Sequence, residues 1–155
     1  MIEAQQATTD REIIVERSFD APRELVFRVW TDPDHVVHWW GPNGFTTTIH
    51  EMDVRPGGFW SYIMHGPDGT DYDNHVEYIE VVRPERLVYW HGERADDPNR
   101  FHVTATFTEH DGRTSLTMRT LFATAAAREY AIREIGAIEG ANQTLNRLAE
   151  HLANL

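Results

Sequence analysis

The hydrophobic and polar positions of the first forty residues predict one strand and two short helices. Residues 12–19 mix β-branched and alternating side chains, as a strand does. Pro22 then opens a segment whose apolar residues recur at helical spacing. Asp32 and Pro33 form a second helix start, and that helix is expected to end near Trp40, before a Gly-Pro step.

From Phe45 to Leu121 the pattern changes to short strands separated by turns. No helical period of useful length interrupts this region, so we expect one antiparallel sheet. The clearest hairpin is centred on an Asp-Gly turn. The expected strands are residues 45–53, 58–65, 73–82, 87–91, 101–108 and a last strand, after Asp111-Gly112, that contains Leu116 and Met118.

The C-terminal segment predicts one long amphipathic helix that begins at Thr124 and runs to the end of the chain. Its apolar stripe consists of Ile132, Ile135, Ile138, Leu145, Leu148 and Leu152. Gly136 and Gly140 are expected to weaken it by roughly 1 kcal/mol each relative to alanine. Because one helix cannot cover a flat sheet, the sheet must curl around it. The expected fold is therefore α+β, with a curved antiparallel sheet of about seven strands wrapped on the last helix.

Length and composition restrict the function classes. The chain has 155 residues, 41% of them hydrophobic, which suits a single domain over residues 12–155 after a flexible N-terminus at residues 1–11. All 14 basic residues are arginine, and 25 acidic residues bring the formal charge to -11. Nucleic acid and anionic membranes are therefore poor partners, since both require clustered positive charge. The absence of lysine excludes a Schiff-base lysine from the sequence.

Two further absences set the expected compartment and chemistry. The sequence has no cysteine, which excludes thiol nucleophiles, zinc-cysteine sites and iron-sulfur ligation. It also has no apolar stretch of about 20 residues and no signal-peptide pattern at its start. We therefore expect a soluble, cytoplasmic protein that uses no cofactor.

Several blocks of the sequence resemble a known family. In chain order they are Trp30 to Pro42 with its Trp-Trp-Gly-Pro, Asp53 to Trp60 with its Arg-Pro-Gly-Gly, Gly66-Pro-Asp-Gly69, and Arg83-Pro-Glu-Arg-Leu-Val-Tyr89. They are similar to the domain called activator of heat-shock-protein-90 ATPase homologue-like, within the START and Bet v 1 helix-grip (SRPBCC) superfamily. The resemblance implies a helix-grip fold, which agrees with the predicted order of elements. Members of that superfamily carry small apolar ligands, cyclise polyketides or modulate a chaperone.

Large side chains on the strands decide what the interior can do. They either fill the space between sheet and helix or line a hollow, and the sequence leaves both alternatives open. A hollow lined by tryptophan and tyrosine would suit an apolar or aromatic ligand with a few polar atoms. The candidate ligand-binding residues are Trp40, Phe45, Trp60, Tyr62, Met64, Tyr78, Trp90, Phe101, Met118, Ile132 and Ile135.

Acid-base catalysis has two candidates, Glu80 and His75. Both lie on the strand from Asp73 to Val82, whose alternation allows either set of side chains to face the helix. An inward carboxylate would have a raised pKa and could act as a base. The other strand histidines, His65 and His102, are expected to face solvent.

Metal binding is not expected. His35 and His38 lie three residues apart on the second short helix, but the sequence places no third ligand beside them. The acidic residues Asp68, Asp71 and Asp73 lack the spacing of a calcium loop and are interpreted as a solvated turn.

Three functions follow, in the order in which the sequence supports them. The first is a domain that binds a small hydrophobic molecule without chemistry. The second is a protein-interaction module, either chaperone-activator-like or a homodimer. The third is an enzyme of the polyketide-cyclase or hydratase kind that uses an inward acid or histidine.

Overall fold

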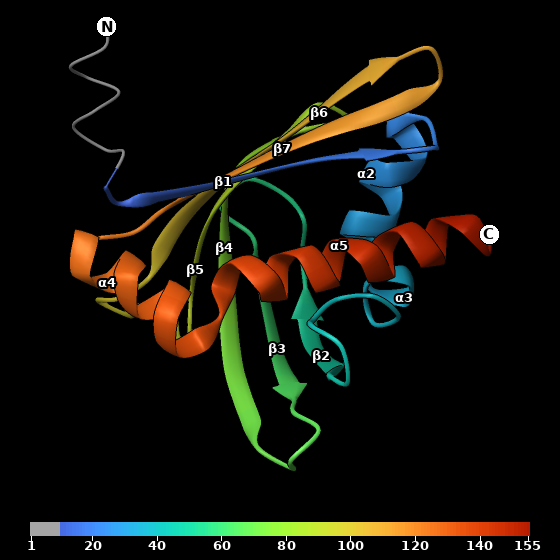
Figure 1. Cartoon of the computed structure of the whole chain (residues 1–155). Coiled ribbons are helices and arrows are strands. Elements are labelled where there is room, and N and C mark those ends of the chain that lie inside the picture. Colours follow the sequence, from blue (N-terminus) through green and yellow to red (C-terminus); the bar gives the residue numbers. More distant parts are fainter. Residues whose placement is uncertain (1–9) are drawn as a thin grey trace, which may run out of the picture.

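The computed structural model describes residues 10–155 and shows a curved antiparallel sheet with helices against its concave side (Figure 1). Residues 1–9 of the predicted flexible N-terminus lie outside the described residues. The elements are β1 (Glu12–Phe19), α2 (Arg23–Thr31), α3 (Pro33–Val36), β2 (Thr46–Met52), β3 (Phe59–His65), β4 (Asp71–Val82), β5 (Arg86–Gly92), β6 (Phe101–His110), β7 (Arg113–Leu121), α4 (Ala125–Tyr130), a π-helix (Ala131–Ile135) and α5 (Ala137–Ala153).

The strand order across the described sheet is β1-β7-β6-β5-β4-β3-β2, with every neighbouring pair antiparallel. The N-terminal strand therefore pairs with the last one, and the other strands follow as hairpins. The register shifts within the β2–β3 pair and again between Tyr78 and Glu80 on β4. Such irregularities bend a strand and redirect its side chains.

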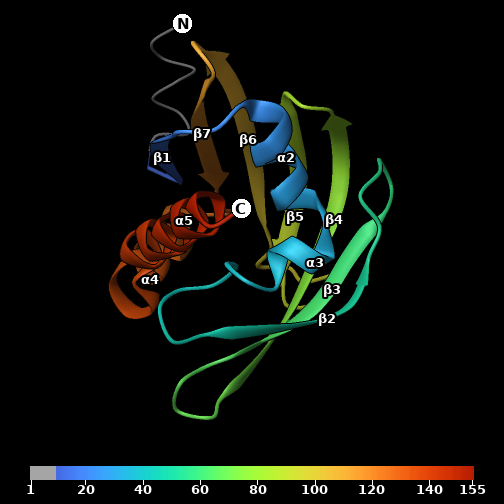
Figure 2. The ribbon, with the colours of Figure 1, turned by 90° about the vertical axis from the view of Figure 1, so that its right-hand side faces the viewer.

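The helices pack on one side of the sheet and close one of its ends. Figures 1 and 2 show α5 running across the concave face. At one end of the molecule α2 packs against β6, where Phe27 contacts Phe107 with ring centroids 5.6 Å apart, and α3 follows it. Leu145 and Leu148 of α5 are buried against the strands. The predicted α+β helix-grip fold is confirmed.

The second short helix ends earlier than the sequence predicts. Asp32 does cap it, since its carboxylate accepts a hydrogen bond from the Asp34 backbone N–H at 2.9 Å. The α-helix stops at Val36 rather than near Trp40, however, and residues 37–39 form a turn. In this turn His38 N and Trp39 N donate to His35 O and Val36 O in tighter i to i+3 hydrogen bonds, at 3.0 and 3.2 Å, which interrupt the regular helical pattern.

The C-terminal segment contains the predicted long helix as α5, but it is not the continuous helix from Thr124 that the sequence predicts. Thr124 caps the first part as expected, since its hydroxyl accepts from the Ala127 N–H at 3.0 Å. A π turn then follows, closed by a hydrogen bond from Gly136 N to Ala131 O, and Gly136 adopts a left-handed φ of 71°. Because of this break, Ile135 and Ile138 do not belong to the buried stripe of the helix. Ile135 is 67% exposed and Ile138 is 41% exposed.

Candidate ligand-binding cavity

An apolar cavity of about 310 Å³ lies between the concave face of the sheet and the start of α5. Five strands contribute to its walls, and the loop after α3 and the π turn complete it. The strand residues that line it are Ile13, Val15, Tyr62, Met64, Tyr89, His91, Phe101, Val103, Met118 and Thr120.

Small residues on α5 leave this space open. Ala137, Gly140 and Ala141 line the cavity where the helix passes over the sheet. At Gly140 a Cβ atom would lie 3.5 Å from Pro42 Cγ, so the helix and the loop after α3 approach closely there. One guanidinium nitrogen of Arg147 donates to Gly41 O at 2.8 Å and to Pro42 O at 3.0 Å, which anchors the loop to the helix.

Aromatic residues of α2, of the segment after α3 and of β3 pack together on one side of the cavity. Trp30, Trp39 and Trp40 make edge-to-face contacts with ring centroids 5.0 to 6.1 Å apart. Trp40 also packs on Trp60 at 4.9 Å, and Trp60 stacks on Tyr62 at 4.1 Å. These rings form a rigid wall, because edge-to-face and offset geometries are the favoured arrangements of aromatic pairs.

His91 is the histidine in the cavity wall, which it shares with the titratable residues Tyr62 and Tyr89. Burial, and secondarily the nearby His75, lowers the pKa of His91 to about 4, so the imidazole is neutral at pH 7. Its Nε2 lies 2.8 Å from Asn74 Oδ1 and 3.1 Å from the Tyr62 hydroxyl oxygen. The Tyr62 oxygen in turn accepts a hydrogen bond from Trp40 Nε1 at 3.0 Å.

The Asn74 amide determines which nitrogen of His91 carries the proton. Asn74 Nδ2 donates to the Tyr72 carbonyl at 3.0 Å, which leaves Oδ1 facing His91. If the Asn74 amide were turned by 180°, its Oδ1 would lie 3.0 Å from the Tyr72 carbonyl oxygen, and both atoms are acceptors. Since Oδ1 can only accept, His91 Nε2 is the protonated nitrogen.

Six of the candidate ligand-binding residues line the cavity. They are Trp40, Tyr62, Met64, Phe101, Met118 and Ile135. Ile135 is also largely exposed, so it lies at the rim, next to the helix break.

The other five candidates lie elsewhere. Trp60 is buried in the aromatic cluster, and Tyr78 packs beside Tyr89 at 6.1 Å without lining the cavity. The ring centroids of Phe45 and Tyr72 lie 6.0 Å apart. Ile132 packs against a separate small cluster of Ile13, Phe122 and Ala131. These four were chosen for size and expected strand or helix face, which do not determine the position relative to the cavity.

Trp90 belongs to the opposite face of the sheet. It alternates with Tyr89 and His91 on β5, so its ring points away from the helix. There the guanidinium of Arg100 lies 4.6 Å from the ring centroid, a cation–π contact.

Both candidates for acid-base chemistry also lie outside the cavity. Inward Val76 and Tyr78 place His75 on the outer face, where its ring stacks on Phe59 at 5.4 Å. After the register shift, Glu80 is half-exposed and accepts from Arg86 Nε at 2.9 Å. Neither side chain can reach a molecule held against His91.

A comparison with models of protein families identifies the family of this chain. The model described as Activator of Hsp90 ATPase homolog 1-like protein matches residues 20–153. The chain belongs to this family. The resemblance noted in the sequence blocks is therefore confirmed.

Solved structures related to the Activator of Hsp90 ATPase homolog 1-like family share the fold. Protein Ms6760 from Mycobacterium smegmatis is 30% identical over 92% of this chain and 91% of that chain, with a TM-score of 0.82. A protein from Staphylococcus epidermidis is 27% identical over 93% and 90%, with a TM-score of 0.81. The AHSA1 protein from Silicibacter pomeroyi is 24% identical over 92% and 97%, with a TM-score of 0.74. No curated protein matches the chain.

Sequence reasoning missed two of the polar residues in the cavity wall of this family member. His91 and Tyr89 were not among the candidates, although both line the wall. A signal was present, because Leu87, Tyr89 and His91 alternate along one strand and Leu87 marks the buried face. Asn74 could not be assigned, since the strand that carries it has the register shift.

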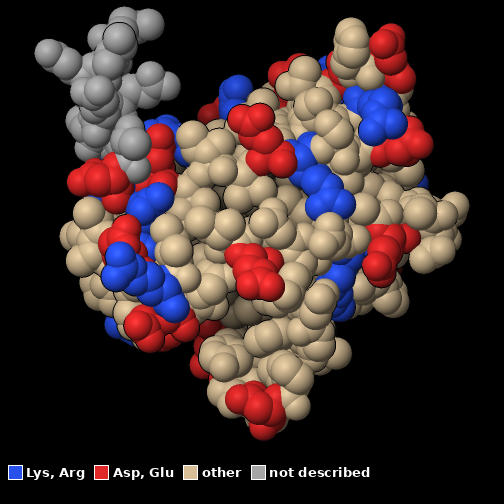
Figure 3. Space-filling view, in the orientation of Figure 1, with Lys and Arg blue, Asp and Glu red and all other residues tan. Residues whose placement is uncertain are grey.

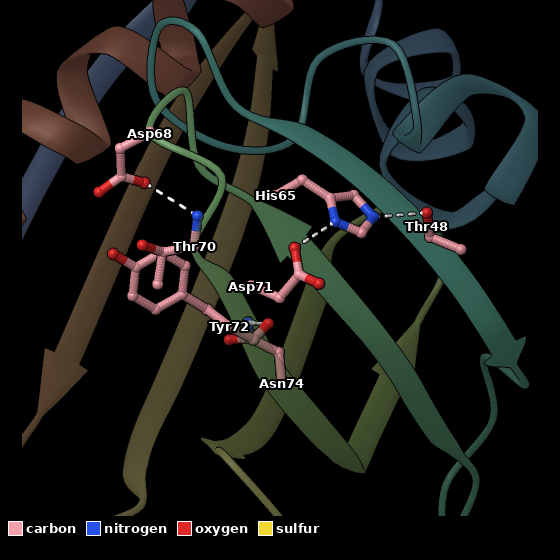
Figure 4. A network of polar contacts seen from close by, with 7 residues as sticks. All are labelled: Thr48, His65, Asp68, Thr70, Asp71, Tyr72 and Asn74. Atoms are coloured by element: carbon pink, nitrogen blue, oxygen red, sulfur yellow. Dashed lines mark hydrogen bonds and ion pairs between the residues drawn. The ribbon is translucent and has the colours of Figure 1, made fainter.

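The remaining histidines form polar networks near the surface. Figure 4 shows His65 between two strands, with Nδ1 2.7 Å from Asp71 Oδ1 and Nε2 2.8 Å from Thr48 Oγ1. In the adjacent turn Asp68 accepts from the Thr70 N–H at 3.0 Å, as expected for a solvated turn. Asp71, His65 and Thr48 are thus connected in that order by hydrogen bonds. None of these residues lines the cavity.

A second histidine group joins α3 to α5. His35 Nδ1 lies 2.9 Å from His151 Nε2, and His38 stacks on the same ring at 5.6 Å. Burial, followed by the two neighbouring histidines, lowers the pKa of His151. Among residues 10–155, no group of three or more histidine, cysteine or acidic side chains is arranged to hold a metal ion.

Two observations concern larger partners. None of the helices in the described part of the chain is long and apolar enough to cross a membrane. On the face drawn in Figure 3, acidic and basic side chains are interspersed among the other residues. That face therefore offers no extended basic surface for a polyanion.

Proposed function

We propose that this chain binds a small, mainly apolar molecule in the cavity between the sheet and α5, without transforming it. The observation that carries the proposal is the cavity itself. Its volume of about 310 Å³ falls at the lower end of the roughly 300–1,000 Å³ of small-molecule sites. Its walls are mostly aliphatic and aromatic, with a few buried polar groups, which is the usual make-up of such sites.

The charge of the wall supports an apolar ligand. Among the described residues, no aspartate, glutamate or arginine lines the cavity. His91, the one titratable base there, is neutral at pH 7 because of its lowered pKa. A charged ligand would lose its hydration without gaining a counter-charge, which is strongly unfavourable.

The alternatives draw less support from the same geometry. An enzyme based on Glu80 or His75 would need those side chains inside, and both lie on the outer face. A protein-interaction module, either a homodimer or a chaperone partner, would not require the cavity. It predicts that small apolar compounds do not bind, so one titration separates the two functions.

The test uses diphenylmethane, an uncharged aromatic hydrocarbon, titrated into the protein and followed by calorimetry and by thermal unfolding. Met118→Trp places a large ring in the cavity and is expected to weaken binding about tenfold or more, because the space is lost. Thr117→Trp is the matched control, since the neighbouring side chain is exposed on the other face of β7 and should leave affinity unchanged.

Unfolding curves of both variants establish that each is folded before affinities are compared. Saturable binding that Met118→Trp abolishes and Thr117→Trp preserves would support the proposal. Absence of binding to the wild-type protein, or equal binding by both variants, would contradict it.

A further inference from the structure

We propose that the ligand of this cavity is an uncharged molecule with a carbonyl oxygen, which accepts hydrogen bonds from the hydroxyl groups of Tyr62 and Tyr89. This inference rests on the proposed function, because it specifies the chemistry of the same site. It follows from the hydrogen bonds that the two tyrosines make and do not make.

The hydroxyl group of Tyr89 is a buried polar group that the folded chain leaves unused. Its ring lines the cavity and is 2% exposed. The oxygen has no hydrogen-bond partner among the described residues. Buried hydroxyl groups are normally paired, so an unpaired one in a cavity wall indicates a partner that is supplied from outside the chain.

The hydroxyl group of Tyr62 is a second donor that lacks an acceptor, for a different reason. Its oxygen accepts a hydrogen bond from Trp40 Nε1, and His91 Nε2 at 3.1 Å is protonated, as the Asn74 amide requires. A protonated nitrogen cannot accept the tyrosine hydroxyl hydrogen. That hydrogen therefore has no acceptor within the Trp40–Tyr62–His91–Asn74 network, while the ring itself lines the cavity.

The rings of both tyrosines lie near His91, with ring-centroid distances of 6.2 Å for Tyr62 and 6.5 Å for Tyr89. Trp60 Nε1 is the other buried group that lacks a partner among residues 10–155, but Trp60 does not line the cavity. Tyr62 and Tyr89 are thus the cavity-lining residues whose hydroxyl hydrogens lack an acceptor in the networks described above.

The ligand atom that fits two donors is an acceptor without a proton of its own. A carbonyl oxygen has two lone pairs and can accept from both hydroxyl groups at once. A ligand hydroxyl would bring an additional donor that also needs a partner. A carboxylate would bring a charge that no lining arginine or lysine neutralises in the described chain.

The test compares benzophenone with diphenylmethane, which has nearly the same shape and a methylene group in place of the carbonyl. The measured quantity is the affinity ratio of the two compounds in the wild-type protein and in Tyr89→Phe, which removes only the hydroxyl oxygen. Loss of one hydrogen bond is expected to reduce the relative preference for benzophenone about three- to tenfold. Tyr78→Phe is the matched control, because Tyr78 is buried on the same face outside the cavity.

Infrared difference spectra of bound benzophenone give a readout that packing alone would not change. The carbonyl stretch should lie at lower frequency in the wild-type protein and in Tyr78→Phe than in Tyr89→Phe, since hydrogen bonding weakens the C=O bond. Tyr62→Phe should produce a further shift in the direction of Tyr89→Phe.

The outcomes separate the two proposals. If both compounds bind and the tyrosine substitutions change neither the affinity ratio nor the carbonyl frequency, the carbonyl inference is overturned and the apolar binding function stands. If neither compound binds the wild-type protein, the proposed function is overturned and this inference falls with it.

Discussion

At the scale of single residues, the wall of the cavity combines hydrophobic contacts with one neutral imidazole. His91 donates to Asn74 of the neighbouring strand β4, which places the proton on Nε2, and it lies beside the hydroxyl of Tyr62. The same burial that keeps His91 uncharged at pH 7 makes the folded state sensitive to acid, because protonation would place a positive charge among apolar side chains.

The pH dependence of stability tests this description of His91. The pKa is about 4 in the folded protein and about 6.5 in an unfolded chain. Between these values the unfolded state binds more protons, so the free energy of unfolding should fall as the pH drops from 6.5 to 4. The loss from this residue is on the order of 3 kcal/mol.

Urea unfolding at several pH values, for the wild-type protein and His91→Gln, provides the measurement. Glutamine retains an N–H donor for Asn74 and cannot titrate, so the variant should lose less stability across the interval. His102 and His151, whose pKa values are also lowered by burial, leave a residual slope in both proteins. Equal slopes in the two proteins would show that His91 is not the buried, neutral group described above.

Residue-level sequence reasoning succeeded where strand alternation was regular. Tyr62 and Met64 lie two residues apart on β3, so alternation places them on one face; both were candidates, and both line the cavity. Trp90 was selected for its aromatic character, although its position relative to Tyr89 places it outside. Glu80 could not be assigned at all, because the register shift that precedes it depends on how β4 pairs with β5.

At the scale of elements, the last helix differs most from the sequence expectation. The sequence treats Gly136 and Gly140 alike, as two residues that weaken a continuous helix. In the structure Gly136 has a left-handed backbone that ends the π turn, whereas Gly140 lies within α5. Periodicity cannot distinguish them, because the place at which the helix breaks depends on its packing against the sheet.

Alanine substitutions of these two glycines should have opposite effects on stability. Gly136→Ala forces a Cβ atom into a left-handed conformation and should destabilise the protein by about 1 kcal/mol. Gly140→Ala should stabilise α5 by up to about 1 kcal/mol, since its Cβ would lie 3.5 Å from Pro42 Cγ, an ordinary contact. Thermal unfolding measures both, and a stabilising Gly136→Ala would argue for a continuous helix.

At the scale of the whole molecule, the curved sheet divides its interior into a filled end and an open one. Trp30, Trp39 and Trp40 pack on one another and fill the space at one end, where Trp30 contacts Phe107 of β6 and Trp40 contacts Trp60 of β3. The small residues at the start of α5 leave a cavity between that helix and strands β1, β3, β5, β6 and β7. The order of elements made the curved sheet predictable, but the division depends on side-chain contacts between distant segments, which periodicity does not describe.

The most direct measurement of the central claim is methyl NMR of the protein titrated with diphenylmethane. Methyl groups of Ile13, Val103 and Leu145 line the cavity, whereas those of Val26 and Leu116 are equally buried outside it. We predict saturable shifts at the first three and little change at the other two. Shifts confined to outer-face residues, or no shifts at all, would contradict the assignment of this cavity as a ligand-binding site.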